Sequence, residues 1–149
     1  MNNKAFIEQL YKNRKLSNDK EYDSFETAIK MLQERIEISD ISDIIKVFCD
    51  DTSDDEVMFG LVHLIEQFVG EDYLKYIAVY SPDMAEAHEW AMTLNRRIIN
   101  SPRYFSMYIN VIRNLDEDQK SKIISLLTDI KNDDPEMFGE KVDLILKEY

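Results

Sequence analysis

The sequence has 149 residues, of which 44% are hydrophobic, and it carries a net charge of −12 at pH 7. This length and composition predict a single domain, residues 1–149, and the charge disfavours nucleic acid and anionic membranes as partners, because both would be repelled. The chain shows no secretory signal and no apolar run that would span a membrane, and its one cysteine, Cys49, suits a reducing compartment, so we expect a cytoplasmic protein.

Helical periodicity covers nearly the whole chain. Only three glycines and three prolines interrupt it, and period-2 alternation is absent, so the sequence predicts an all-α fold. Nine helices are expected, at 3–15, 20–37, 41–49, 54–69, 72–80, 82–99, 103–115, 117–132 and 135–148.

Capping residues mark several helix starts. Each proline follows a residue that suits the N-cap, in the pairs Ser81-Pro82, Ser101-Pro102 and Asp134-Pro135. Further starts are predicted at Asp40, Ser53 and Asp116. Many acidic residues therefore have a structural explanation, because carboxylates also suit the positive end of a helix dipole.

A short apolar motif recurs at a spacing of 32 residues, at 45–48, 77–80 and 109–112. A turn and a longer helix follow each copy, so the repeated unit is a helical hairpin. Antiparallel hairpins of this size typically stack into a HEAT-like α-solenoid. An irregular helical bundle is the alternative, because helical periodicity alone also produces such matches.

The negative charge is concentrated in the middle of the chain. Residues 36–95 carry 14 acidic and 2 basic side chains, whereas the segments on either side are nearly balanced. Acidic surfaces commonly serve solubility alone. Concentration in one segment instead favours a surface that binds a cationic partner.

The sequence offers little chemistry for an active site. The glycines do not form a phosphate-binding loop, and one cysteine and two histidines do not form a metal cluster, so neither a cofactor nor a metal is expected. His63 and Glu66 lie one helical turn apart, but a nucleophile and an orienting group are missing nearby. We therefore expect no enzyme activity, and a structural or binding role for His63.

Trp90 is the single tryptophan, and it lies at the border between the apolar and polar faces of the helix expected at 82–99. One interpretation is a residue at the edge of the core. The other is an aromatic anchor for a lysine or arginine of a partner, flanked by Glu86 and Glu89.

Three segments, residues 58–66, 88–91 and 94–101, resemble the bacterial immunity protein 30 family of polymorphic toxin systems. The resemblance runs from about residue 41 to 149, and residues 1–40, the N-terminal helices, add nothing to it. It implies a small cytoplasmic protein that binds and blocks a toxin encoded beside it, with no enzyme mechanism. The positions that match the recurrent residues of the family are His63, Glu66, Trp90, Arg97 and Asn100.

The resemblance and the charge pattern lead to one hypothesis. Many such toxins attack nucleic acid and must present a basic cleft, which an acidic protein can fill. The expected partner is thus a cognate toxin, such as a nuclease, with a basic surface. An adaptor for a cationic protein unrelated to toxins is the alternative. The candidate binding residues are Asp50, Asp51, Asp54, Asp55, Glu56, His63, Glu66, Glu86, Glu89, Trp90, Arg97 and Asn100.

Overall fold

The computed structural model describes residues 2–147, and every regular element in that range is helical, as predicted. The α-helices are α1 (Asn3–Asn13), α2 (Asp19–Leu32), α3 (Ile41–Ile44), α4 (Asp55–Ile65), α5 (Glu71–Tyr80), α6 (His88–Ile99), α7 (Pro102–Arg113), α8 (Glu117–Asp133) and α9 (Pro135–Leu146). Three short 3-10 helices accompany them: η1 (Ile38–Asp40), η2 (Ile45–Val47) and η3 (Ser81–Asp83). Residue 148, where the last helix was expected to end, lies outside the described range.

Polar side chains begin several helices as the sequence predicts. Ser101, Asp116 and Asp134 each accept a hydrogen bond from a backbone N–H in the first turn of the helix that follows. The start predicted at Ser53 lies one residue too early, because the Asp54 carboxylate accepts the N–H of Val57. Asp40 precedes α3, but its side chain does not cap that helix. Its carboxylate accepts the N–H of Glu37, the N-cap residue of η1, and so stabilises the start of η1 instead.

Several of the expected helices were wrong in part. The helix expected at 20–37 ends at Leu32, and the helix expected at 54–69 ends at Ile65. The helix expected at 41–49 keeps only four α-helical residues and then tightens into η2, whose Lys46 carbonyl accepts a hydrogen bond from the Arg14 guanidinium at 3.3 Å. The helix expected at 82–99 begins only at His88, and Ser81-Pro82 lies in η3. Ser81 does not cap a helix, because its buried hydroxyl accepts a hydrogen bond from Asn95.

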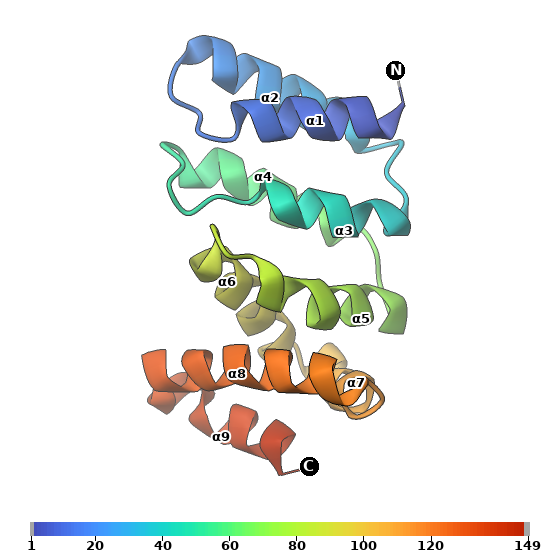
Figure 1. Cartoon of the computed structure of the whole chain (residues 1–149), viewed down its shortest axis with the longest axis vertical. Helices are drawn as coiled ribbons and strands as arrows, with labels where there is room; N and C mark the ends of the chain where they lie inside the picture. Colours follow the sequence, from blue (N-terminus) through green and yellow to red (C-terminus); the bar gives the residue numbers. More distant parts are fainter. Residues whose placement is uncertain (1, 148–149) are drawn as a thin grey trace. The chain divides into compact units, whose positions relative to one another are not determined.

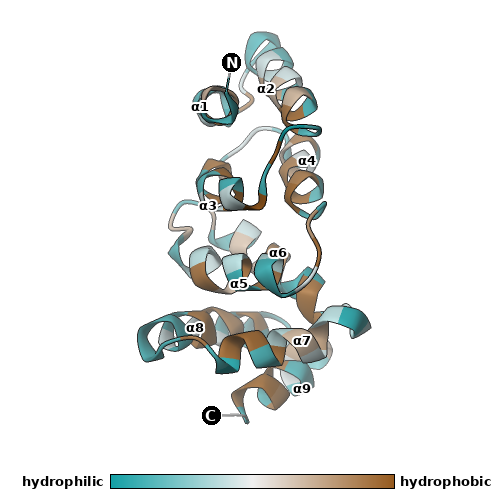
Figure 2. Ribbon diagram, turned by 90° about the vertical axis from the view of Figure 1, so that its right-hand side faces the viewer, coloured by the Kyte–Doolittle hydropathy of each residue, from teal (hydrophilic) through white to brown (hydrophobic). Residues whose placement is uncertain are grey.

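The chain divides into two compact units, Met1–Phe68 and Val69–Tyr149, here called unit 1 and unit 2. The organisation as one domain stays a prediction. In unit 1, α1 and α2 form an antiparallel hairpin, while α3 with η2 pairs with α4 (Figure 1). The helix α1 packs on η2 and α2 packs on α4, so the second hairpin is stacked on the first. Figure 2 shows that α4 is mostly hydrophobic, and its Met58, Leu61 and Val62 are fully buried.

Unit 2 repeats this arrangement. Here α5 packs on α7 and α6 packs on α8, and α9 closes the unit against α8. This helix-on-helix stacking of successive hairpins within each unit is consistent with the HEAT-like arrangement predicted from the 32-residue period. The copies of the motif at 77–80 and 109–112 lie near the ends of α5 and α7, and the copy at 45–48 begins with η2.

Candidate partner-binding surface

Five acidic residues gather where the chain leaves η2 and enters α4. We call residues 50–56 the acidic loop; its members are Asp50, Asp51, Asp54, Asp55 and Glu56. All are exposed except Asp54, which is partly covered while it caps α4. The Asp51 side chain is 91% exposed, so its carboxylate is open to a partner. The first five candidate residues therefore lie on one short segment, and their role in binding stays a prediction.

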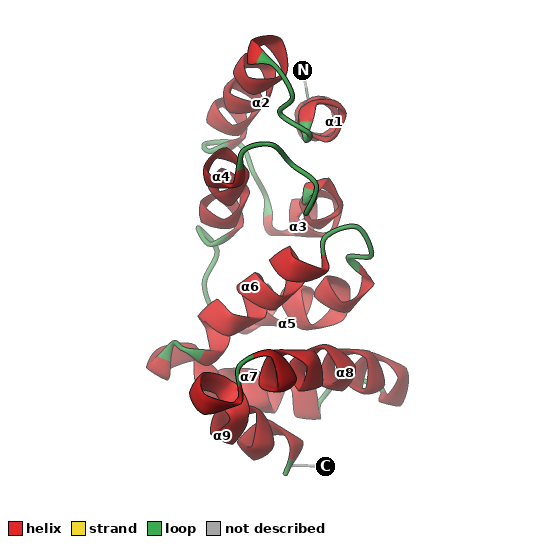
Figure 3. Ribbon diagram, turned by 90° about the vertical axis from the view of Figure 1, so that its left-hand side faces the viewer, coloured by secondary structure: helices red, strands yellow, loops and turns green. Residues whose placement is uncertain are grey.

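The acidic loop is fastened to the turn between α1 and α2, although more than 30 residues separate the two in sequence. The Thr52 hydroxyl donates to the carbonyl of Arg14 at 2.9 Å, and the Ser53 N–H donates to the carbonyl of Lys15 at 2.8 Å. Figure 3 shows the two loops as neighbouring segments of unit 1. The loop therefore has a defined shape rather than being held only at its ends.

Lys15 provides the positive charge at this place. Its ammonium group lies 3.4 Å from the Cys49 sulfur and 3.3 Å from an Asp51 carboxylate oxygen. The contact with Cys49, and then that with Asp51, raises the pKa of Lys15 above its usual value of 10.5, because both favour the protonated amine. Lys15 is therefore a cation throughout the physiological pH range.

His63 and Glu66 lie in and just after the last turn of α4. His63 is exposed, and its ring packs edge-on against Phe59 with 5.1 Å between ring centroids. Glu66 is the C-cap residue and is half-buried. Within residues 2–147, no group of three or more His, Cys, Asp or Glu side chains is placed to hold a metal ion.

The remaining candidates belong to unit 2 and surround α6. Glu86 and Glu89 are exposed near the start of this helix, while Arg97 and Asn100 are exposed at its end. Trp90 is only 8% exposed, which favours its interpretation as a residue at the edge of the core. The expectation that Glu86 and Glu89 extend the edge formed by the acidic loop concerns both units, and it stays a prediction.

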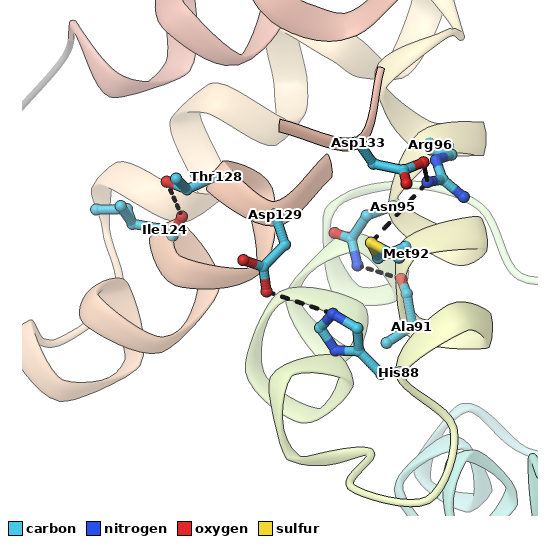
Figure 4. Close-up of polar contacts among 9 residues, drawn as sticks. All are labelled: His88, Ala91, Met92, Asn95, Arg96, Ile124, Thr128, Asp129 and Asp133. Carbon is cyan, nitrogen blue, oxygen red and sulfur yellow. Dashed lines mark hydrogen bonds and ion pairs between the residues drawn. The ribbon is translucent and has the colours of Figure 1, made fainter. Parts of the chain in front are cut away.

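Sequence reasoning missed the polar contacts that hold α6 and α8 together. His88 pairs with Asp129 at 3.3 Å and Arg96 pairs with Asp133 at 2.7 Å, so two contacts bridge these neighbouring helices (Figure 4). It also missed Lys15 and Thr52. Their partners lie 34 to 38 residues away in sequence. The repeat and the helical periodicity predict helices, so they do not predict contacts between two loops.

The comparisons with known proteins give one positive finding. A family model described as Immunity protein 30 matches residues 12–108, which is more than half of the chain. No curated protein and no solved structure matches this chain. The matched region begins near the end of α1 and ends in α7, so it starts and ends earlier than the resemblance placed at 41–149. It includes the acidic loop, the turn that holds it and all of α6.

None of the helices in the described part is long and apolar enough to cross a membrane.

Proposed function

The chain belongs to the immunity protein 30 family, and we propose that it acts in the cytoplasm as the immunity protein that binds and neutralises a cognate secreted toxin. The family match carries this proposal. The chain works by binding, without catalysis and without a cofactor or metal of its own.

We further propose that the acidic loop contacts a basic surface of the toxin. Four exposed carboxylates on one short segment create a local negative potential, which speeds the encounter with a cationic partner. A toxin that cleaves nucleic acid needs a basic cleft to hold phosphates, so a nuclease fits this surface. The exposed candidates Glu86, Glu89, Arg97 and Asn100 of unit 2 would add contacts, while Trp90 would support them from the core.

The first experiment tests the function itself. The C-terminal toxic domain encoded beside this gene is expressed in a bacterial host with and without this chain, and surviving colonies are counted. We expect survival only when both are present and a complex when both are purified. If the chain neither binds nor protects, the toxin-binding function is wrong, and an adaptor for another cationic protein becomes the better interpretation.

A second experiment locates the binding surface with a matched control. Asp55 and Glu56 occupy the first turn of α4, and Glu71 and Asp72 occupy the same positions of α5. All four are exposed, so reversing either pair to lysine changes the net charge and the helix dipole equally. We expect the α4 pair to slow association on the order of tenfold at low salt, with a smaller effect at 0.15 M salt because of screening. Equal slowing by the α5 pair would show that only the total charge matters.

A further inference from the structure

The turn that holds the acidic loop has an unusual backbone. Leu16 has a φ of 51°, in the left-handed region that branched side chains rarely adopt. Its side chain is 6% exposed, so burial of the leucine offsets the cost of this conformation. Lys15, the residue before it, offers its carbonyl to the Ser53 N–H and its ammonium group to Asp51.

The neighbouring residues anchor both sides of this contact. The Arg14 guanidinium donates to the Lys46 carbonyl at 3.3 Å, at the point where η2 leads into the loop. Cys49 is 1% exposed and lies against the Lys15 ammonium group. The contacts therefore reach both the segment just before the loop, at Lys46 and Cys49, and the loop itself, at Asp51 to Ser53.

The acidic loop has a physical need for such an anchor. Four aspartates and one glutamate within seven residues repel one another, so a loop held only at its ends would spread over many conformations. Ordering those conformations on binding would lower the affinity for a partner. A loop that already holds its bound shape avoids this loss.

We propose that the turn 14–16 holds the acidic loop in its toxin-binding shape, with Lys15 and Thr52 as positioning residues. This inference rests on the proposed function. The observations that support it are the hydrogen bonds and the ion pair that join the turn to the loop. In this proposal the turn supports the binding surface, although Lys15 has the charge opposite to that of the loop.

Charge and position predict opposite results for Lys15, which makes the inference testable. Lys15→Met makes the chain more negative, so simple electrostatics predicts faster association with a cationic toxin. Loss of positioning predicts weaker binding. Lys46 is the matched control, because it is an exposed lysine of unit 1 whose ammonium group contacts Asp43 at 3.9 Å. Arg14 bonds to the backbone carbonyl of Lys46, which the substitution keeps. Thr52→Val completes the set, since it removes the hydroxyl donor without changing charge or shape.

The binding experiment uses the full chain and the toxic domain encoded beside its gene, made inactive by mutation. We expect Lys15→Met and Thr52→Val each to weaken binding about fivefold, and Lys46→Met to leave it unchanged or to speed association slightly. Lys15→Arg should restore most of the affinity. If the wild type binds and Lys15→Met behaves like Lys46→Met, while Thr52→Val binds normally, the positioning role is wrong and the proposed function stands.

Hydrogen exchange in the free protein tests the anchor without a partner. We expect the Ser53 amide to exchange several times faster in Thr52→Val and Lys15→Met than in the wild type, with the amides of α4 unchanged. Unaltered exchange at Ser53 would overturn the anchor even if binding fell. If exchange speeds up but the wild type does not bind the toxic domain, the proposed function is wrong and the turn only braces the fold.

Discussion

Units 1 and 2 stack their hairpins in the same way but fasten them differently. In unit 1, polar contacts that are distant in sequence join loops at the surface, through Lys15 and Thr52. In unit 2, Asn95 lies in the core with no exposed surface, donates to the Ser81 hydroxyl and to the Ala91 carbonyl, and accepts from the Tyr108 hydroxyl. Core contacts of this kind fix the register of helices, whereas loop contacts shape a surface with little effect on the core. Unit 2 therefore has a polar network inside its core, whereas the contacts of Lys15 and Thr52 in unit 1 join surface loops.

The largest expected effect comes from breaking the core network of unit 2. Asn95→Leu removes the buried hydrogen bonds that the Asn95 side chain makes with Ser81, Ala91 and Tyr108, which costs about 3 kcal/mol. Urea unfolding followed by the fluorescence of Trp90, the single tryptophan and a residue of unit 2, measures this loss. Asn110→Leu is the control, because Asn110 is exposed on α7 and its replacement should change stability by less than about 0.5 kcal/mol.

A double variant shows whether the network acts as a unit. Tyr108→Phe removes one of the hydroxyl groups that lose their bond to residue 95 in Asn95→Leu, so the double variant should lose less stability than the sum of the two single variants. Additive losses would mean that the residues stabilise unit 2 separately. The contrast with unit 1 would then be weaker.

The two units also differ in how they form a left-handed turn. Unit 1 places Leu16 there, whereas unit 2 places Gly70 with a φ of 96° before α5. A Cβ at Gly70 would meet nothing within 4 Å, so Gly70→Ala should destabilise through backbone strain alone, by about 2 kcal/mol. Gly139→Ala is the control within α9, where a Cβ makes only an ordinary contact with Pro135 and should stabilise the helix by about 0.5–1 kcal/mol. Urea unfolding measures both, and a loss at Gly139 that matches the one at Gly70 would contradict the strain argument.

Local signals in the sequence predicted most of the fold. Ser101-Pro102 and Ser81-Pro82 look alike as helix starts, yet only the first is one, because the Ser81 hydroxyl bonds to Asn95, 14 residues away. The apolar spacing predicted α6 correctly from residue 88 onward but did not show that Asn95 lies among core residues. Caps and periodicity act within one helix, so they locate helices well and tertiary contacts poorly.

The candidate site follows the same rule. The acidic residues of the loop are consecutive or nearly so, and their accumulation is visible in the sequence. The turn 14–16 is not visible in this way, because it joins the loop through two backbone carbonyls and one lysine, none of which has a sequence signature. The resemblance was also placed too late in the chain to include the turn, whereas the family match includes it.

The smallest expected effect concerns unit 1, and it is the contribution of Lys15 to the pH dependence of the free energy of unfolding. The pKa of Lys15 is raised in the folded protein, first by Cys49 and then by Asp51, so its contacts stabilise the fold fully below the unfolded value of 10.5. This stabilisation is lost as the pH rises through the higher pKa of the folded state, where the amine loses its proton. We therefore expect a small difference in the free energy of unfolding between wild type and Lys15→Met that is constant from pH 7 to 9 and disappears above pH 10.5. Urea unfolding of both proteins at each pH measures it, and Lys46→Met serves as the control for the loss of an exposed lysine.

Because Lys15 is exposed, its contribution to stability stays small even where its contribution to the shape of the acidic loop is large. A difference that grew above pH 10.5 would mean that the ammonium group does not stabilise the loop, and that its contact with Asp51 plays no part in holding the surface.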